Sequence, residues 1–339
     1  MSKMIYTSIP GIDKPVAKLA MGSMIFTTRD DVTGCQWMEQ TKDNSFRLLD
    51  EAFELGYNTI DTARGYAGGD SERSLGEWMK SRGVRDKIFF VNKGCAKGNY
   101  FVRNSPELII HDIIETLDVM QMDYSDIYMC HRDNPDVPVE EIVDAFAMMQ
   151  RLGYIHGYGG SNWLLSRTKR AVEYAKEKGY PPFIAAEPGF SLAVPVTYSW
   201  SDSDEYLSQP EFRENYEYYR DTKLTIFTWS SMARGFWSGL YDRETCEQYR
   251  DTWDKTCIKA YWGEDNWKRM DRVKELSKRI GASVPNIALA YLLNQPLDIH
   301  PIIGANTKED CISNLQALDI KLDQATLDWL SLESDERPW

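Results

Sequence analysis

The sequence predicts an α/β protein that folds as a (β/α)8 TIM barrel, a single domain over residues 1–339 with long loops on its C-terminal face. First, a short apolar run rich in β-formers, a turn and a helical pattern recur eight times along the chain. Eight such units are the number that closes a parallel barrel. Second, no linker or low-complexity segment divides the chain. A doubly wound open sheet is the alternative, but the Gly-rich fingerprint that usually follows its first strand is not found.

Each expected strand is a short apolar segment that ends at a turn or at a polar residue. In order they are Ala17–Met21, Thr59–Asp61, Ile88–Asn92, Asp126–His131, Ile155–Gly159, Phe183–Ala186, Leu224–Trp229 and Ile299–Ile303. The helical segments between them repeat apolar residues at three- and four-residue spacing, and several begin at capping residues. They are Asn44–Leu55, Ser71–Lys80, Pro106–Met120, Val139–Arg151, Ser166–Lys178, Pro210–Tyr219, Val284–Leu293 and Thr307–Leu315. Residues 231–266 are expected to form a long loop.

Composition and charge narrow the class of protein. The formal net charge of −13 argues against nucleic acid and anionic membranes as partners. No apolar run reaches the roughly 18 residues of a membrane span, and the first residues lack a secretory signal. The six cysteines follow no C-x-x-C spacing, which favours a reduced, cytoplasmic protein without a metal site. They are Cys35, Cys95, Cys130, Cys246, Cys257 and Cys311.

Polar side chains stand at the ends of three consecutive expected strands. Asp61 ends the second strand, with Tyr66 five residues later, Lys93 follows the third strand, and His131 ends the fourth. In a parallel barrel these strand ends open into one mouth. An ammonium near a phenol lowers the phenol pKa, and Asp61 can hold that ammonium charged. A proton donor, a cation and a hydrogen-bonding imidazole suit carbonyl reduction, in which a proton reaches the substrate oxygen.

The segment Gly56–Gly76, which contains Asp61-Thr-Ala-Arg-Gly-Tyr66, closely resembles the first signature of the aldo-keto reductases. Asp126-Ile-Tyr-Met-Cys-His131 resembles the strand that carries the catalytic His of that family. The resemblance extends over nearly the whole chain and implies a barrel that binds a nicotinamide cofactor without a Rossmann fold. It also implies that Tyr66 is the general acid and that Asp61, Lys93 and His131 complete a catalytic tetrad.

Further segments resemble the cofactor site of that family. By this resemblance Ser161 and Asn162 bind the nicotinamide carboxamide. The segment Glu187-Pro-Gly-Phe190 has Glu where the family has a carboxamide-binding Gln, and Phe190 where it has a stacking ring. Because a carboxylate accepts but does not donate hydrogen bonds, Glu187 changes the bonding pattern expected there. The other implied cofactor contacts, from the first strand, from the pyrophosphate loop and from the adenosine segment, are Gly22, Ser23, Met24, Asp61, Trp229, Ser230, Met232, Arg234, Gly304, Asn306, Asp310 and Asn314.

The adenosine segment Ile302–Asn314 indicates which cofactor is preferred. NADPH-preferring members of the family have Lys or Arg at the places of Gly304, Asn306 or Asp310, and this chain has neither at any of the three. A 2′-phosphate calls for such cations, whereas Asp310 would repel it and could accept from a ribose 2′-OH. We therefore expect a slight preference for NAD(H) over NADP(H), with Lys308 as the one cation that could turn inward.

The substrate is expected to be a small carbonyl compound or alcohol, and the candidate contacts are Met24, Tyr66, His131, Trp163 and Trp237. Aromatic residues crowd the loop after the seventh strand. They either pack that loop or form a wall that suits a sugar, a sugar-like ketone or aldehyde, or a flat polycyclic ketone. The oligomeric state is left open by the sequence.

Two other functions compete with an NAD(P)-dependent oxidoreductase. Some members of the family are regulatory subunits of membrane channels and retain the tetrad, so a cofactor-binding regulatory subunit with little turnover is the main alternative. A barrel glycosidase that uses Asp61 and Glu187 is the other. The Lys93 and Tyr66 side chains beside Asp61 disfavour the glycosidase.

Overall fold

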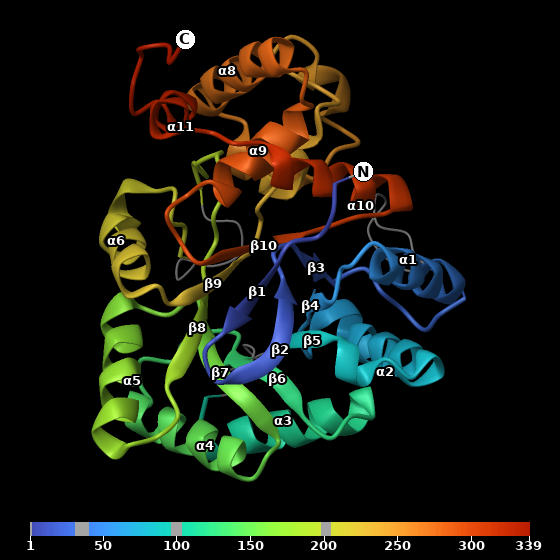
Figure 1. The fold of residues 1–339 in the computed structure, drawn as a ribbon, viewed down its shortest axis with the longest axis vertical. Coiled ribbons are helices and arrows are strands. Elements are labelled where there is room, and N and C mark those ends of the chain that lie inside the picture. Colours follow the sequence, from blue (N-terminus) through green and yellow to red (C-terminus); the bar gives the residue numbers. More distant parts are fainter. Residues whose placement is uncertain (1, 31–40, 96–103, 198–204) are drawn as a thin grey trace. The chain divides into compact units, whose positions relative to one another are not determined.

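The fold is a closed barrel of eight parallel strands, seen in a computed structural model that describes residues 2–30, 41–95, 104–197 and 205–339 (Figure 1). The strands follow one another in the order β10-β3-β4-β5-β6-β7-β8-β9. This confirms the predicted fold class. The strands are β3 (Ala20–Gly22), β4 (Thr59–Asp61), β5 (Phe89–Gly94), β6 (Ser125–Cys130), β7 (Ile155–Ser161), β8 (Phe183–Glu187), β9 (Thr225–Thr228) and β10 (Ile299–Ile303).

The helices that alternate with the strands have apolar faces and defined ends. For example, α1 begins after Thr41, whose side chain accepts from the backbone N–H of Asn44, and α2 ends at Gly83 in a left-handed conformation. The helices are α1 (Lys42–Glu54), α2 (Asp70–Arg82), α3 (Pro106–Met120), α4 (Val139–Arg151), α5 (Leu165–Lys178), α6 (Arg213–Thr222), α7 (Lys255–Tyr261), α8 (Glu264–Ile280), α9 (Val284–Leu293), α10 (Lys308–Gln316) and α11 (Gln324–Ser331).

Three parts of the fold differ from the expectation. A hairpin of β1 (Tyr6–Ile9) and β2 (Ile12–Ala17) precedes the barrel, so Ala17 ends a hairpin strand and the first barrel strand begins at Ala20. Helix α7 and the start of α8 lie within residues expected to be loop. The 3₁₀ segment Pro210–Phe212 replaces the first turn of the helix expected from Pro210.

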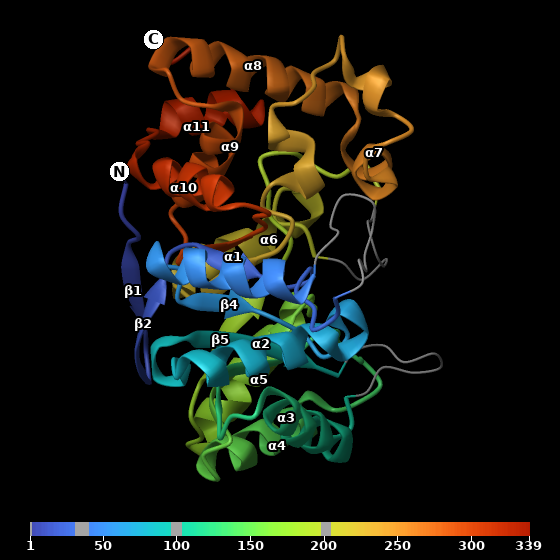
Figure 2. The same cartoon turned by 90° about the vertical axis from the view of Figure 1, so that its right-hand side faces the viewer.

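The chain divides into two compact units. Unit 1 contains residues 1–4, 188–303 and 309–339, and unit 2 contains residues 5–187 and 304–308. In unit 2, the helices α3, α4 and α5 lie on the outer side of the strands that they connect (Figure 1). In unit 1, α8 packs against both α9 and α11 (Figure 2).

The strands of unit 2 form its core. All six residues of β5 and all six of β6 are buried, as expected when parallel strands are covered on both faces. Their registers place Asp61 beside Val91, Lys93 beside Met129, and Ser161 beside Glu187. Consecutive strand ends therefore carry the polar side chains singled out in the sequence. Within the described residues, no helix has the length and apolar character needed to cross a membrane.

Candidate active site

Asp61 and Lys93 form a buried ion pair at the ends of β4 and β5. The Lys93 Nζ donates to Asp61 Oδ2, and the two residues are 0% and 3% exposed. A backbone hydrogen bond also links the segment after β4 to β5, because the N–H of Arg64 donates to the Lys93 carbonyl at 3.0 Å. Although burial opposes the positive charge, Asp61 and then Glu187 raise the pKa of Lys93 above its ordinary value. Lys93 is thus a fixed cation at neutral pH.

Tyr66 begins a 3₁₀ turn, Tyr66–Gly69, directly after the segment that follows β4. Its side chain is half-buried, and its ring centroid lies 5.5 Å from the Lys93 Nζ. Burial raises the pKa of Tyr66 above the ordinary phenol value, while the Lys93 charge opposes that rise and the charges of Asp61 and Glu187 add to it. The expected lowering by Lys93 is therefore outweighed by burial and by the two carboxylates.

His131 directly follows β6, and its backbone N–H donates to the Gly94 carbonyl at 2.8 Å. Its ring meets the Tyr66 ring edge-on, with centroids 5.7 Å apart and an angle of 78° between the planes. Burial, the Lys93 charge and the Arg132 charge hold the pKa of His131 well below its ordinary value. The imidazole is therefore neutral and has one N–H to donate.

Glu187, the last residue of β8, joins the same group of charges. Its Oε2 lies 3.1 Å from the Lys93 Nζ, and the residue is 2% exposed. Burial and the neighbouring Asp61 carboxylate raise the pKa of Glu187 to about 8. Lys93 therefore lies against two carboxyl groups. The sequence pointed to Glu187 as a carboxamide contact and as a carboxylate of the alternative glycosidase, but nothing in its segment shows that the side chain turns toward Lys93.

Ser161 and Asn162 lie at the end of β7, next to the end of β8. The Ser161 Oγ donates to the Glu187 carbonyl at 3.1 Å, and the Asn162 Nδ2 donates to the Ser161 Oγ at 3.0 Å. Asn162 has a left-handed φ of 54°, which Asn tolerates better than most residues. Amide, hydroxyl and carboxyl groups thus meet at two adjacent strand ends. This donor and acceptor set fits a carboxamide, although the contacts themselves stay a prediction.

The residues after β3 divide into buried and exposed side chains. Gly22 ends the strand, and Ser23 is fully buried with its Oγ 3.0 Å from the Ser71 Oγ, which donates to it. Met24, by contrast, is 44% exposed and is a large apolar side chain in reach of solvent. Of the three predicted contacts here, Met24 is the one whose side chain is accessible.

Trp163 is buried and packs against side chains of unit 2. It is 2% exposed, its ring lies 5.7 Å from that of Phe183, and the Arg167 guanidinium lies 5.7 Å from it. A Cβ at Gly160 would come within 2.8 Å of the indole, so glycine is needed for this packing. Its role in binding substrate stays a prediction.

The remaining predicted contacts after β8 and β9 belong to unit 1. The Phe190 ring meets those of Tyr216 and Tyr291 edge-on at 6.1 and 6.2 Å, and these rings line a cavity of about 990 Å³. None of the four tetrad residues lines this cavity. The Trp229 ring instead lies 4.7 Å from the Tyr206 ring. Stacking of Phe190 on a nicotinamide stays a prediction.

The loop after β9 has an unusual backbone. Ser230, Ala233, Arg234 and Gly235 all have left-handed φ angles, and Met232 lies among them. Such runs can turn successive N–H groups toward an anion. The Arg234 guanidinium, however, pairs with Asp254 at 2.5 Å.

The loop aromatics pack on one another. Trp237 is fully buried, its Nε1 donates to the Ser191 Oγ at 3.2 Å, and its ring lies 4.9 Å from that of Phe236. The Tyr241 ring lies 5.2 Å from the Trp253 ring. These contacts favour packing over a substrate wall for this group.

In the adenosine segment, Lys308 pairs with Glu54, Nζ to Oε2 at 3.6 Å. Glu309 and Asp310 place two acids in the first turn of α10, and Asn314 lies one turn further along that helix. Gly304 and Asn306 precede the helix. Acidic side chains in the first turn interact favourably with the positive end of the helix dipole and repel a second anion there.

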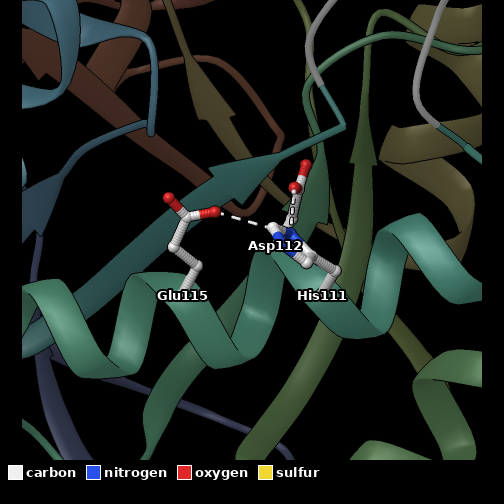
Figure 3. A group of neighbouring side chains, drawn as sticks. All are labelled: His111, Asp112 and Glu115. Carbon is white, nitrogen blue, oxygen red and sulfur yellow. Dashed lines mark hydrogen bonds and ion pairs between the residues drawn. The ribbon is translucent and has the colours of Figure 1, made fainter.

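His111, Asp112 and Glu115 form a cluster on α3, with possible ligand atoms within 4.8 Å of one another (Figure 3). The Arg64 guanidinium already bridges the two carboxylates, pairing with Asp112 and, at 2.5 Å, with Glu115. Asp112 also accepts from the Cys95 backbone N–H at 2.8 Å. The carboxylates of this cluster hold the segments after β4 and β5. The sequence did not indicate this role because Arg64 and Cys95 are distant from α3 along the chain.

The cysteines within the described residues are buried and form no disulfide bond with one another: Cys95, Cys130, Cys246, Cys257 and Cys311. A buried thiol packs as a small apolar side chain. Cys35 lies outside the described residues.

Comparisons with known proteins identify the family of this chain. The aldo/keto reductase family is matched over residues 18–330. A norsolorinic acid reductase of Emericella nidulans is 26% identical over 91% of this chain and 75% of its own length. An aryl-alcohol dehydrogenase [NADP(+)] of Phanerodontia chrysosporium is 25% identical over 95% of this chain and 83% of its own.

Two further similarities broaden this picture. A putative voltage-gated potassium channel subunit beta of Schizosaccharomyces pombe is 27% identical over 83% of this chain and 80% of its own length. A thermostable aldo-keto reductase crystallised with the inhibitor epalrestat has the same fold, with a TM-score of 0.69 and 22% identity over 98% of this chain and all of that one.

The closed barrel alone is compatible with many activities, and the family match decides the class of this protein. The chain belongs to the aldo/keto reductase family. Members of this family generally use NAD(P)H, and the relatives with enzymatic names are reductases and dehydrogenases.

Proposed function

We propose that this protein is an NAD(P)-dependent oxidoreductase that interconverts a carbonyl compound and an alcohol, with Tyr66 as the general acid and base. The observation that carries the proposal is the grouping of Tyr66, Lys93 and His131, with the Tyr66 ring 5.5 Å from the Lys93 Nζ and 5.7 Å from the His131 ring. The half-buried phenol can reach a substrate while the cation stays buried.

Each residue has a separate task in carbonyl reduction. The Tyr66 hydroxyl gives its proton to the carbonyl oxygen as that oxygen gains charge. Lys93 stabilises the resulting phenolate, Asp61 holds Lys93 in place, and neutral His131 donates a hydrogen bond to the same substrate oxygen. In alcohol oxidation the Tyr66 phenolate takes the proton back.

The nicotinamide, when bound, would supply the hydride to the carbonyl carbon. Ser161, Asn162 and Glu187 are the residues that would hold its carboxamide, since their hydroxyl, amide and carboxyl groups meet at the ends of β7 and β8. Gly22, Ser23, Met24, Trp229 and the loop from Ser230 to Arg234 are the further proposed contacts. This assignment rests on the donor set and on family membership.

We infer a slight preference for NAD(H). Gly304, Asn306 and Asp310 offer no cation to a 2′-phosphate, Lys308 is paired with Glu54, and the first turn of α10 is acidic. The inference rests on this chain's own residues and differs from the relative of Phanerodontia chrysosporium, which is named for NADP(+).

A turnover assay tests the proposed function. Purified protein is mixed with NADH or NADPH and a panel of carbonyl compounds, and cofactor oxidation is followed. The panel should contain sugar aldehydes and ketones, the class suggested by the sequence, and aryl and polycyclic carbonyl compounds, because relatives carry such names. Turnover with any of them supports the proposal, whereas tight cofactor binding without turnover on the whole panel would contradict it.

The similarity to a putative potassium channel subunit favours a second candidate, a cofactor-binding regulatory subunit with little turnover. This function needs the cofactor site but no productive substrate site. Cofactor binding that persists without turnover, together with a stable complex between this protein and a membrane channel, would support it.

A further inference from the structure

We propose that Glu187 is a positioning residue that sets how much of the Lys93 charge acts on Tyr66. Protonated Glu187 leaves that charge available to the phenol, and ionised Glu187 cancels part of it. The inference rests on the proposed role of Tyr66 as the acid and base.

The buried charges around Lys93 do not balance if both neighbouring carboxyl groups are ionised. One ammonium, that of Lys93, faces the carboxyl groups of Asp61 and Glu187, and all three residues are at most 3% exposed. If both carboxyl groups were ionised, a net negative charge would be buried without a second cation. Two carboxyl groups that share one site usually share one proton, because the second ionisation is opposed by the first.

The proton belongs on Glu187 for a geometric reason. The Lys93 Nζ donates to Asp61, which makes Asp61 the better-stabilised carboxylate, whereas Glu187 lies at 3.1 Å. Burial and the Asp61 charge raise the pKa of Glu187 to about 8. A protonated Glu187 can both donate and accept a hydrogen bond, as can the amide expected at this position of the family.

Among the described residues, the charged neighbours of Glu187 are Asp61 and Lys93. β7 contributes Ser161, and Asn162 directly follows it; neither has an ionisable side chain. His131, after β6, is held neutral. The groups that respond to ionisation of Glu187 are therefore Asp61, Lys93 and, through Lys93, Tyr66.

Ionisation of Glu187 changes the pKa of the Tyr66 phenol. The ionised Glu187 carboxylate raises the pKa of Tyr66, in the same direction as the Asp61 carboxylate and against Lys93. In the pH range above the pKa of Glu187, the phenolate needed for alcohol oxidation forms less readily than it would beside an uncharged side chain. Replacing Glu187 with the isosteric amide removes that negative charge.

The test is a phenol titration of Glu187→Gln in the cofactor-free protein. The chain has 19 tyrosines, so the Tyr66 signal is obtained as the ultraviolet difference between each protein and its Tyr66→Phe derivative. We expect the Tyr66 phenol to titrate at a pH lower by about one unit in Glu187→Gln, because one nearby negative charge is lost. An unshifted titration overturns the proposal.

Glu72→Gln is the matched control. Glu72 is also buried, burial raises its pKa to about 7, and it accepts from the Thr116 hydroxyl at 3.1 Å rather than pairing with Lys93. We expect Glu72→Gln to leave the Tyr66 titration in place. A shift as large as that of Glu187→Gln would show a general effect of buried acids and would contradict the inference.

Infrared difference spectra between pH values, taken on the protein with Glu187 intact, give a second readout that does not depend on the folding of Glu187→Gln. The spectra are repeated on the double variant Glu72→Gln, Glu205→Gln, which lacks two other buried acids. A carboxylic acid band that disappears around pH 8 in this background supports the inference, and its absence overturns it. Neither readout requires turnover. If the carbonyl assay fails, the proposed function is contradicted, but the effect of Glu187 on Tyr66 can still be measured.

Discussion

Lys93 lies at the centre of the site at the residue scale. It is fully buried, donates to Asp61, lies 3.1 Å from Glu187 and faces the Tyr66 ring. A buried lysine is stable in its charged form only when such partners surround it. The chemistry proposed for Tyr66 therefore depends on a cation that two neighbouring strands keep in place.

Replacing Lys93 with Met tests this dependence. The methionine is close in length but has no charge, so the phenolate of Tyr66 loses its stabilising cation. We expect the rising limb of the pH profile for alcohol oxidation to move to higher pH, opposite to the shift expected for Glu187→Gln. An unchanged profile in a folded Lys93→Met protein would argue against the pairing of Lys93 with Tyr66.

Part of the site could be predicted from sequence because it follows directly from the strand ends. Asp61, Lys93 and His131 each end or follow a strand, so barrel closure alone predicts that they approach one another. The place of Glu187 beside Lys93 and the bridge from Arg64 to Asp112 and Glu115 could not be predicted in this way. They depend on side-chain directions that no local pattern encodes.

At the element scale, the strands and helices that alternate regularly were predictable and the additions were not. The strands from β4 to β10 occupy apolar runs between turns, which is a local signal. The hairpin of β1 and β2 turns at Pro10-Gly11, where Gly11 has a φ of 87°, but its residues alternate weakly in burial. Helix α8 has apolar residues every three positions from Trp267 to Leu276, yet it adjoins an irregular segment that obscures its start.

Helix α10 carries the prediction on cofactor choice. Replacing Asp310 with Arg exchanges an acid in its first turn for a cation that can pair with a 2′-phosphate. We expect the ratio of kcat/KM for NADPH to that for NADH to rise by about tenfold or more, as one charge-assisted hydrogen bond predicts. Glu309→Gln, which removes a neighbouring acid without adding a cation, is the control. A KM for NADPH well below that for NADH in the unsubstituted protein would contradict the NAD(H) preference.

At the scale of the whole molecule, the family match over residues 18–330 and the closed barrel account for nearly the entire chain. Two compact units are distinguished within it, and the single-domain organisation over residues 1–339 stays a prediction. The tetrad, Ser161, Asn162 and Glu187 all belong to unit 2, so the proposed proton chemistry is assembled within one unit.

Buried carboxyl groups also link the stability of the molecule to pH. Burial raises the pKa of Glu205 in unit 1 to about 7 from an ordinary 4.5, although Asn215 and Tyr219 donate to it at 2.7 and 3.1 Å. Between these values the unfolded chain has lost this proton and the folded chain has kept it. The free energy of unfolding therefore falls as pH rises through this range.

We expect Glu205→Gln to flatten that fall, measured by urea unfolding at about pH 5 and about pH 7. Glu217→Gln, on the exposed face of α6, is the control and should keep the pH dependence of the parent. An identical pH dependence in the Glu205→Gln protein would show that this carboxyl group is not the source.

The kcat of Tyr66→Phe, on a substrate that the parent turns over, shows most directly whether the Tyr66 hydroxyl transfers the proton. Phenylalanine keeps the ring beside His131 and Lys93 but removes the hydroxyl that transfers the proton. We predict a kcat lower by about 10²–10⁴, the usual range for loss of a positioned acid, with cofactor binding retained in a fluorescence titration. An unchanged kcat would contradict the account, because the proton would then come from another group.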